Sequence, residues 1–374
     1  MSERRVVELL ERTPVDRDAE ERAWAVVHAA FAEREPVRRR PRLLPAVALA
    51  VVAAVAVAAA FSSSGRAVVH AVGRSLGIAH AQPALYRLPA PGRLLVSGAG
   101  GAWVVSSDGS TRLLGPYEQA SWSPHGRFVV GATQNRLATL APDGTVHWTL
   151  ARALIRFPRW GGTLVDTRIA YLTVGRLHVV AGDGTNDGRL EAAPDAARVA
   201  PAWRPSRDDR HVLAYVAAGG RVAVVDADRS TLLWISPAYA GARALAWSAD
   251  GSRLALATRD RVLVFDGPSG RIASTIRVAG VRAVAYGPDG RLALLRPHAI
   301  LLRDGRALRP LFVPPGGTVA GLAWSPDGRW LLTGLPAADE WVFLQTRGKR
   351  ILAVSHIASE FGGFPSLDGW APGA

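Results

Sequence analysis

Apolar and polar residues alternate along most of the chain in short runs separated by tight polar turns. The stretch 321–334, GLAWSPDGRWLLTG, shows the pattern: one apolar run ends at Trp324 and a second begins at Trp330. Between them, the residues at 325–328 are Ser-Pro-Asp-Gly, and each suits its position in a type I turn. The pattern therefore predicts a strand, a tight turn and a second strand.

This strand-turn-strand phrase recurs along the chain. Near-copies are QASWSPHGRFVVGAT from 119, ALAWSADGSRLALAT from 244 and AVAYGPDGRLALL from 283. In each copy a large aromatic residue, here called the anchor, ends the first strand. The anchors are Trp122, Trp160, Trp203, Trp247, Tyr286 and Trp324, with Tyr86 as a weaker member before them. From Tyr86 onward the anchors are 36, 38, 43, 44, 39 and 38 residues apart.

A second hairpin signal falls between successive anchors. Examples are LATLAPDGTVHWTL from 137 and VLVFDGPSGRIAS from 262, each an apolar run on either side of a polar turn. Each period of about 40 residues therefore holds about four strands, which is typical of a β-propeller blade. A lone four-stranded blade cannot bury its faces, whereas blades stacked in a ring bury both. We predict an all-β fold, a seven-bladed β-propeller of four-stranded blades over residues 83–374.

The end of the chain predicts how the ring closes. Phe364 follows Trp324 by 40 residues and is itself followed by Pro365 and an Asp-Gly pair. We interpret Phe364 as the anchor of a closing strand that pairs with strands near 93–115. Tyr86 is then a linker residue, and the number of blades is still seven.

These repeats resemble a known family. Over 86–370, about three-quarters of the chain, they are similar to the WD40-like PD40 repeats of TolB-type propellers. The Gly-His and Trp-Asp dipeptides of true WD40 repeats do not occur in the sequence. The resemblance implies an extracytoplasmic propeller that serves as an interaction platform. It carries over no particular partner, because the matching residues belong to the scaffold.

One segment before the repeats has the character of a membrane span. Residues 43–61, LLPAVALAVVAAVAVAAAF, contain no charged side chain and as a helix would extend roughly 28 Å. Arginines crowd its N-terminal edge, at positions 38, 39, 40 and 42. The positive-inside rule then predicts a cytoplasmic N-terminus and an extracytoplasmic propeller, with 62–82 as a juxtamembrane linker. A cleaved signal peptide and a buried helix of a soluble protein are the alternatives.

The first 42 residues predict a short helical stub in the cytoplasm. A helical apolar face includes Val27 and Phe31, with Trp24 beside it, and we expect this face to dock on a partner. The layout resembles that of membrane-bound anti-sigma factors, which implies a regulatory role. The zinc-binding His-Cys-Cys motif of many such proteins is missing, since the chain has no cysteine. A passive cytosolic tail is the alternative.

Charge narrows the choice of partners. The formal net charge is +14, and the chain has a single lysine, Lys349, so nearly all of the basic residues are arginines. These arginines are spread along the chain rather than clustered on one element, so we expect no nucleic-acid binding. A basic surface does attract anionic wall polymers or lipid headgroups.

Candidate chemistry is sparse. None of the nine histidines stands in an H-x-x-x-H or H-E-x-x-H arrangement, and there is no G-x-S-x-G elbow. The stretch 183–188 has some likeness to a calcium loop but lacks the downstream glutamate, so we interpret it as a hairpin turn. The acidic pair at 208–209 is likewise interpreted as a turn. We therefore predict no catalytic residue, no metal and no cofactor.

Together these features favour a non-enzymatic protein- or ligand-binding platform anchored in the cell membrane. Two alternatives remain open at the level of sequence. The first is an extracytoplasmic lyase or glycoside hydrolase that uses the central pocket of the ring. The second is a structural protein that binds an anionic cell-wall polymer.

Overall fold

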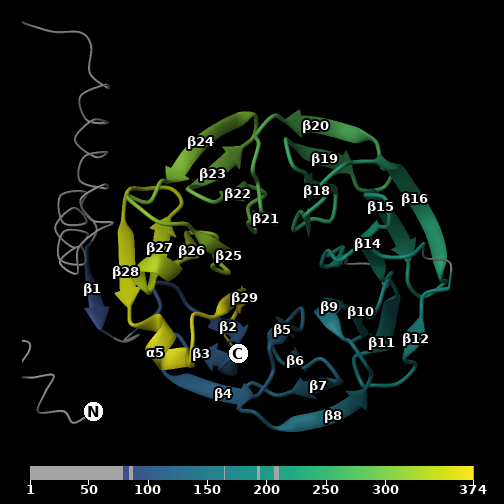
Figure 1. The fold of residues 1–374 in the computed structure, drawn as a ribbon, viewed down its shortest axis with the longest axis horizontal. Helices are drawn as coiled ribbons and strands as arrows, with labels where there is room; N and C mark the ends of the chain where they lie inside the picture. The colour runs from purple at the N-terminus through teal and green to yellow at the C-terminus, as the bar shows by residue number, and fades with distance from the viewer. Residues whose placement is uncertain (1–78, 84–86, 164, 192–193, 206–209, 374) are drawn as a thin grey trace, which may run out of the picture. The chain divides into compact units, whose positions relative to one another are not determined.

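Seven sheets form a ring around a common axis in the computed structural model, and the four strands of each blade run antiparallel (Figure 1). The structure describes residues 79–83, 87–163, 165–191, 194–205 and 210–373. Each sheet contains four strands that follow one another from the axis outward, and one sheet carries an added fifth strand. The prediction of an all-β, seven-bladed propeller with four-stranded blades is confirmed.

The blades are numbered along the chain, with their strands given from the axis outward. Blade 1 contains β29 (Ser366–Ala371), β2 (Arg93–Gly98), β3 (Gly101–Val105) and β4 (Thr111–Gly115). Blade 2 contains β5 (Gln119–Trp122), β6 (Val129–Ala132), β7 (Arg136–Leu140) and β8 (Val146–Ala151). Blade 3 contains β9 (Arg156–Gly162), β10 (Thr167–Leu172), β11 (Leu177–Ala181) and β12 (Gly188–Arg189). Blade 4 contains β13 (Ala202–Trp203), β14 (Val212–Ala217), β15 (Arg221–Asp226) and β16 (Thr231–Ala238).

The remaining three blades follow the same order. Blade 5 contains β17 (Ala244–Trp247), β18 (Arg253–Ala257), β19 (Val262–Asp266) and β20 (Ile272–Ile276). Blade 6 contains β21 (Ala283–Tyr286), β22 (Leu292–Arg296), β23 (Ala299–Asp304) and β24 (Ala307–Phe312). Blade 7 contains β25 (Ala320–Trp324), β26 (Trp330–Leu335), β27 (Glu340–Gln345) and β28 (Ile351–Ser355), with β1 (Ala79–Pro83) parallel to β28 at its outer edge.

Two short helices lie in connections between strands, one within blade 7 and one after its last strand. The 3-10 helix η1 (Pro336–Ala338) connects β26 to β27, and α5 (Ile357–Phe361) follows β28. In the part of the chain that the structure describes, no helix is long and apolar enough to cross a membrane. The predicted span 43–61 lies outside the described residues. So do the stub 1–42 with Trp24, Val27 and Phe31, and most of the linker, so these boundaries stay predictions.

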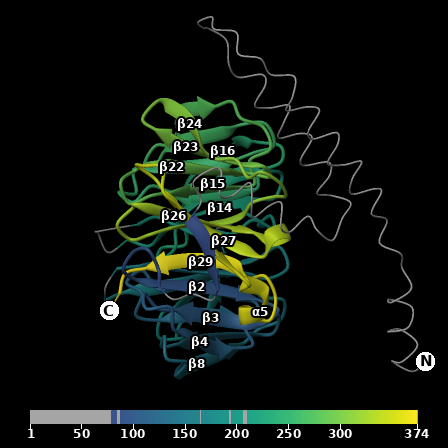
Figure 2. The same cartoon turned by 90° about the vertical axis from the view of Figure 1, so that its left-hand side faces the viewer.

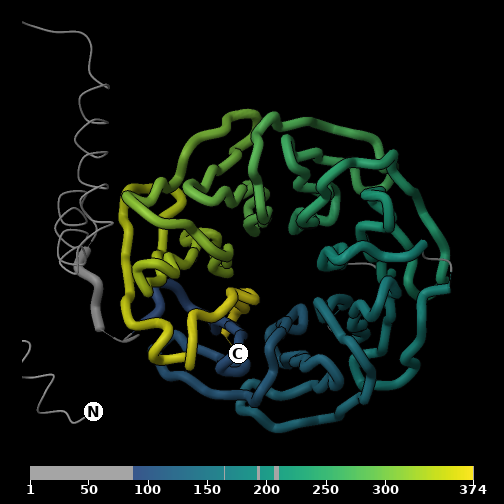
Figure 3. The backbone as a smooth tube through the Cα atoms, in the orientation of Figure 1, coloured from purple at the N-terminus to yellow at the C-terminus, as the bar shows by residue number. Residues whose placement is uncertain are grey.

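The two ends of the propeller meet in blade 1. Strand β29, which comes last in the sequence, pairs antiparallel with β2 and lies closest to the axis (Figures 2 and 3). The predicted closure is present, but its anchor is Trp370, which pairs with Leu94, and not Phe364. Helix α5 and Gly362 and Gly363, both with positive φ, occupy the connection and delay the strand until Ser366. The ring of Phe364 lies over Gly334 of blade 7 instead.

The anchors pack between neighbouring blades. Trp122, Trp160, Trp247, Trp324 and Trp370 are each at most 8% exposed. The indole nitrogens of three anchors also donate hydrogen bonds to backbone carbonyls of the preceding blade: Trp203 to Arg159 (2.9 Å), Trp247 to Ala202 (3.0 Å) and Trp324 to Ala285 (3.1 Å). An anchor therefore contributes both apolar burial and a polar link across the blade interface.

Replacement of an anchor should open the interface that it fills. We expect Trp324→Ala to lower the free energy of unfolding by about 3–5 kcal/mol, as for other large core deletions. The change removes the buried ring, its hydrogen bond to Ala285 and its contact with the Arg291 guanidinium, 5.4 Å from the ring centre. Chemical denaturation measures the loss. A variant as stable as the parent would show that the anchor is dispensable.

The closing strand also carries a buried acid. Asp368 sits at a β-bulge in β29, between residues paired with Leu95 and Val96 of β2. Burial raises the pKa of Asp368 to about 7, while the Ser97 hydroxyl and the Arg159 guanidinium lower it only in part. The native state therefore holds this proton more tightly than the unfolded chain does. The stability that this provides is lost as pH rises from 3.8 to about 7.

Removing the ionisable group should remove this pH dependence. We expect Asp368→Asn to lose less stability than the parent between about pH 5 and about pH 8, because an amide cannot ionise. Denaturant unfolding at the two pH values measures the difference. Asp304→Asn, at an exposed position, controls for loss of a carboxylate elsewhere. Equal pH slopes for the parent and Asp368→Asn would contradict the assignment.

Candidate functional site

Strand pairing gives each blade a cross-strand row of three side chains on the face toward the preceding blade. The row consists of the anchor, its partner on the second strand and that residue's partner on the third. Six rows are apolar throughout: Trp370–Leu94–Val105, Trp122–Val129–Leu140, Trp160–Ile169–Val180, Trp203–Leu213–Val225, Trp247–Leu254–Phe265 and Trp324–Leu331–Leu344. The row of blade 6 is Tyr286–Leu292–Arg303. Blade 6 therefore has a smaller anchor and a charged residue where the other blades are apolar.

The facing surface of blade 5 is also reduced. Its outer strand β20 places Ser274 opposite Val264 of β19. The equivalent positions in blades 2 and 4 are Trp148 and Trp234, opposite Thr139 and Val224. Serine is far smaller than tryptophan, so the space that an indole fills at those interfaces is not filled between blades 5 and 6.

A polar link that is present between blades 2 and 3 and between blades 4 and 5 is replaced here by a different one. Trp148 and Trp234 donate their indole N–H to the carbonyls of Gly182 and Gly267, each two residues after the third member of the next blade's row. The corresponding carbonyl in blade 6 belongs to Gly305. It accepts a hydrogen bond from the Arg303 Nε at 2.9 Å. Arg303 thus satisfies a carbonyl that a tryptophan satisfies elsewhere, but it leaves space beside it.

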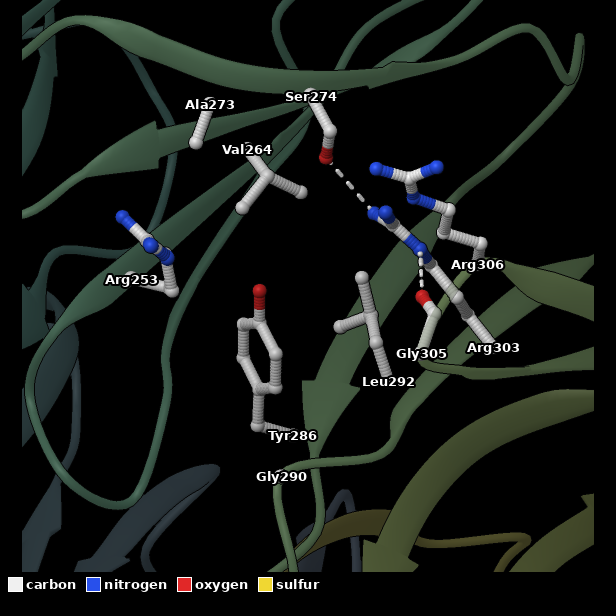
Figure 4. A pocket seen from close by; sticks show the side chains of 10 residues that line it. All are labelled: Arg253, Val264, Ala273, Ser274, Tyr286, Gly290, Leu292, Arg303, Gly305 and Arg306. Atoms are coloured by element: carbon white, nitrogen blue, oxygen red, sulfur yellow. Dashed lines mark hydrogen bonds between the residues drawn. The ribbon is translucent and has the colours of Figure 1, made fainter.

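The result is a pocket of about 310 Å³ between blades 5 and 6 (Figure 4). Blade 5 and its β18–β20 strands form one wall, and blade 6 with its turns at 287–291 and 304–307 forms the other. Ten described residues line the pocket: Arg253, Val264, Ala273, Ser274, Tyr286, Gly290, Leu292, Arg303, Gly305 and Arg306. The volume is at the low end of the range for small-molecule sites.

The pocket has a positive character. Arg253 is compensated, because its guanidinium forms an ion pair with Asp266 at 2.7 Å. Arg303 bonds only to neutral acceptors, donating to the Ser274 hydroxyl at 2.9 Å and to Gly305. Arg306 is exposed and has no hydrogen-bond or ion-pair partner among the described residues. Two guanidinium groups at the pocket are therefore not matched by a carboxylate.

Tyr286 adds a neutral donor. Its hydroxyl points into the space between Arg253 on one side and Arg303 on the other (Figure 4). Burial raises the pKa of Tyr286 to about 12, and the nearby arginines lower it only in part. The phenol therefore keeps its proton at neutral pH and can donate a hydrogen bond. The pocket gathers donors of three kinds, guanidinium, phenol and alcohol.

A second polar cluster bridges blades 3 and 4. The imidazole of His211 is fully buried, with Nδ1 2.7 Å from an Asp228 oxygen and Nε2 3.1 Å from the Asp166 carbonyl. Arg168 forms ion pairs with both aspartates. All members of this network are satisfied by one another, and the histidine is closed to solvent. We assign the cluster to the cohesion of the two blades.

The structure locates the other residues considered from sequence. The 183–188 stretch connects β11 to β12 as a turn, with the Asp183 carboxylate accepting hydrogen bonds from the Thr185 amide (2.9 Å) and hydroxyl (2.7 Å). The pair at 208–209 lies outside the described residues. Across the described chain, no group of three His, Asp or Glu side chains is placed to hold a metal ion.

Sequence reasoning singled out Tyr286 as an anchor but missed its partners in the pocket. Arg253, Ser274 and Arg303 come from different strands, and no local motif joins them. Their signal is available only after the hairpins are aligned by strand register. Arg303 then stands where the other six rows have an apolar residue.

A match to a known repeat family agrees with the fold. The WD40 repeat family (WD domain, G-beta repeat) matches residues 309–344, which run from the outer strand of blade 6 through β27 of blade 7. No curated protein sequence matches the chain. The solved structure of Kuenenia stuttgartiensis hydrazine synthase is similar over 60% of this chain and 75% of that chain, at 17% identity and a TM-score of 0.48. The chain thus carries a WD40-like seven-bladed propeller.

Arg303, the charged residue of the blade 6 row, should lower the free energy of unfolding compared with an apolar residue at the same position. We expect Arg303→Leu to raise the free energy of unfolding by about 1 kcal/mol, because leucine gives blade 6 the apolar row of its neighbours. The reverse change at the equivalent position of blade 7, Leu344→Arg, should lower it by about 2 kcal/mol or more, because it buries an unpaired charge. Denaturant unfolding compares the two. Destabilisation by Arg303→Leu would make Arg303 a structural residue.

Proposed function

We propose that this protein is a non-enzymatic binding platform, a WD40-like propeller that a single N-terminal anchor holds on the extracytoplasmic side of the membrane. Its propeller binds a partner that presents an anionic group to the pocket between blades 5 and 6. The proposal combines the observed pocket with the membrane span predicted at 43–61.

The observation that carries the proposal is the set of polar groups in the pocket. Arg303, Arg306 and Tyr286 are all donors, and no carboxylate or imidazole is among the ten described residues that line the space. A guanidinium stays charged at any physiological pH, and the phenol of Tyr286 keeps its proton. Such groups hold an anion in place but do not exchange protons with it. The chemistry favours binding over acid–base catalysis.

The charge of the whole chain supports the same partner class. With a formal net charge of +14, the protein attracts anionic molecules before any specific contact forms. Arginine suits this purpose, since its planar guanidinium pairs with oxyanions through two parallel hydrogen bonds. An anionic envelope polymer, an acidic protein and a lipid headgroup all carry such groups. The proposal also includes a regulatory role for the stub at 1–42, because its predicted apolar face could dock on a cytoplasmic partner.

A protease test on intact spheroplasts examines the proposed topology. We expect added protease to digest the propeller and to leave a small membrane-bound fragment that retains an N-terminal tag, because moving the four arginines before residue 43 across the bilayer costs several kcal/mol. Permeabilised spheroplasts, in which the tag is also digested, provide the control. Full protection of the propeller would reverse the orientation. Release of the propeller without protease would show a cleaved signal peptide.

A further inference from the structure

We propose that the pocket between blades 5 and 6 binds the phosphate group of a small phosphate ester of the glycerol phosphate type. The inference rests on the proposed function and names the chemistry that its site recognises. Three features of the site support it: the arrangement of the donors, the size of the space and the difference between this interface and the other six.

The donors surround the pocket instead of lining one wall. Arg303 and Arg306 lie together beside Ser274, Arg253 lies on the opposite side, and the Tyr286 hydroxyl points between them (Figure 4). A planar carboxylate offers two oxygens in one plane, whereas a tetrahedral phosphate offers oxygens in several directions. A ring of donors of this kind therefore matches phosphate better. The two guanidinium groups without a carboxylate partner match a charge of up to −2.

Two of the guanidinium donors, those of Arg303 and Arg253, are also held in place before a ligand arrives. Arg303 is fixed by hydrogen bonds to Ser274 and Gly305, both at 2.9 Å, and Arg253 by its ion pair with Asp266. The Ser274 oxygen accepts from Arg303, so its own proton is free to point into the pocket. Fixed donors lose little conformational freedom on binding, which favours affinity.

The apolar part of the lining sets the size and nature of the rest of the ligand. Val264, Leu292 and the ring of Tyr286 form apolar walls of the pocket beside the charged groups. A space of about 310 Å³ accommodates a phosphate with a short polyol such as glycerol. Longer chains extend to solvent past Arg306, which is exposed.

The neighbouring interface shows what a closed version of the site looks like. Between blades 6 and 7, Arg291 occupies a position similar to that of Arg253, and it is only 4% exposed. Its guanidinium stacks on Trp324 and bonds to Asp289, Gly328 and Thr346. The guanidinium of Arg291 is therefore occupied by contacts within the protein. The arginines of the pocket have no indole to stack on, because the anchor of blade 6 is Tyr286.

Binding is measured by isothermal titration calorimetry on the full chain in a non-ionic detergent. Inorganic phosphate and glycerol 3-phosphate are the probes, and glycerate, which replaces the phosphate with a carboxylate, is the comparison ligand. We expect both phosphates to bind and glycerate to bind at least about tenfold more weakly, the effect of one lost charge-assisted hydrogen bond. Equal affinity for glycerate would overturn the phosphate assignment, and so would the absence of phosphate binding.

Variants locate the site. Arg303→Leu and Tyr286→Phe each remove a donor and should weaken glycerol 3-phosphate binding about tenfold or more. Arg277→Ala removes an exposed charge of blade 5 that does not line the pocket, and it should leave the affinity unchanged. Circular dichroism confirms that each variant is folded. Unchanged affinity in both Arg303→Leu and Tyr286→Phe, or an equal loss in Arg277→Ala, would overturn the site.

Two sources of the phosphate ester are distinguished by vesicle binding. If the ligand is a lipid headgroup, phosphatidylglycerol vesicles should capture the chain in a way that Arg303→Leu weakens. If the source is a soluble or polymeric ester, Arg303→Leu weakens glycerol 3-phosphate binding but not vesicle capture. Both results support the pocket. Binding by the purified chain does not depend on the compartment, so a reversed topology in the protease test would remove the proposed function and leave this inference standing.

Discussion

The packing of one aromatic side chain between each pair of neighbouring blades is the interaction on which this ring depends. A four-stranded blade has two apolar faces, and a single sheet has no second layer that could bury either of them. The anchor of one blade covers the preceding blade, and in three interfaces its indole also donates to a carbonyl there. Each interface in the closed ring has its own anchor. Loss of one anchor therefore weakens an interface that the other anchors do not fill. Ring closure by β29 places Trp370 at the interface between blades 7 and 1.

This constraint explains why the exception in blade 6 is informative. Tyr286 and Arg303 are smaller or more polar than all of their equivalents, and Ser274 is smaller than the tryptophans at its position in blades 2 and 4. One such change is ordinary variation. Three that meet at one interface create a pocket lined by donors, at some cost in apolar burial. Proteins commonly give up stability in this way where a site needs polar groups and space.

Much of the fold was accessible from sequence because its signals are local. The Ser-Pro-Asp-Gly turn after Trp324 and the periodic aromatic residues predict blades, their number and the closing strand. The position of the last anchor was wrong, since a short helix and two glycines before Ser366 shift the strand, and no periodic pattern reports such an insertion. The pocket was not predictable, because Arg253 and Arg303 lie on different blades. Only strand register shows that they face one space.

The central claim is that the space beside Tyr286 is a site for an oxyanion and not a packing defect. The most direct measurement is the thermal unfolding temperature of the full chain as phosphate is added, in parallel for the parent and for Tyr286→Trp, which fills the space as in the other blades. Phosphate stabilises proteins in general, and this effect is common to both chains. Specific binding adds a further rise that saturates with phosphate concentration. We predict that extra, saturable rise in the parent alone, and an identical response of the two proteins would contradict the account.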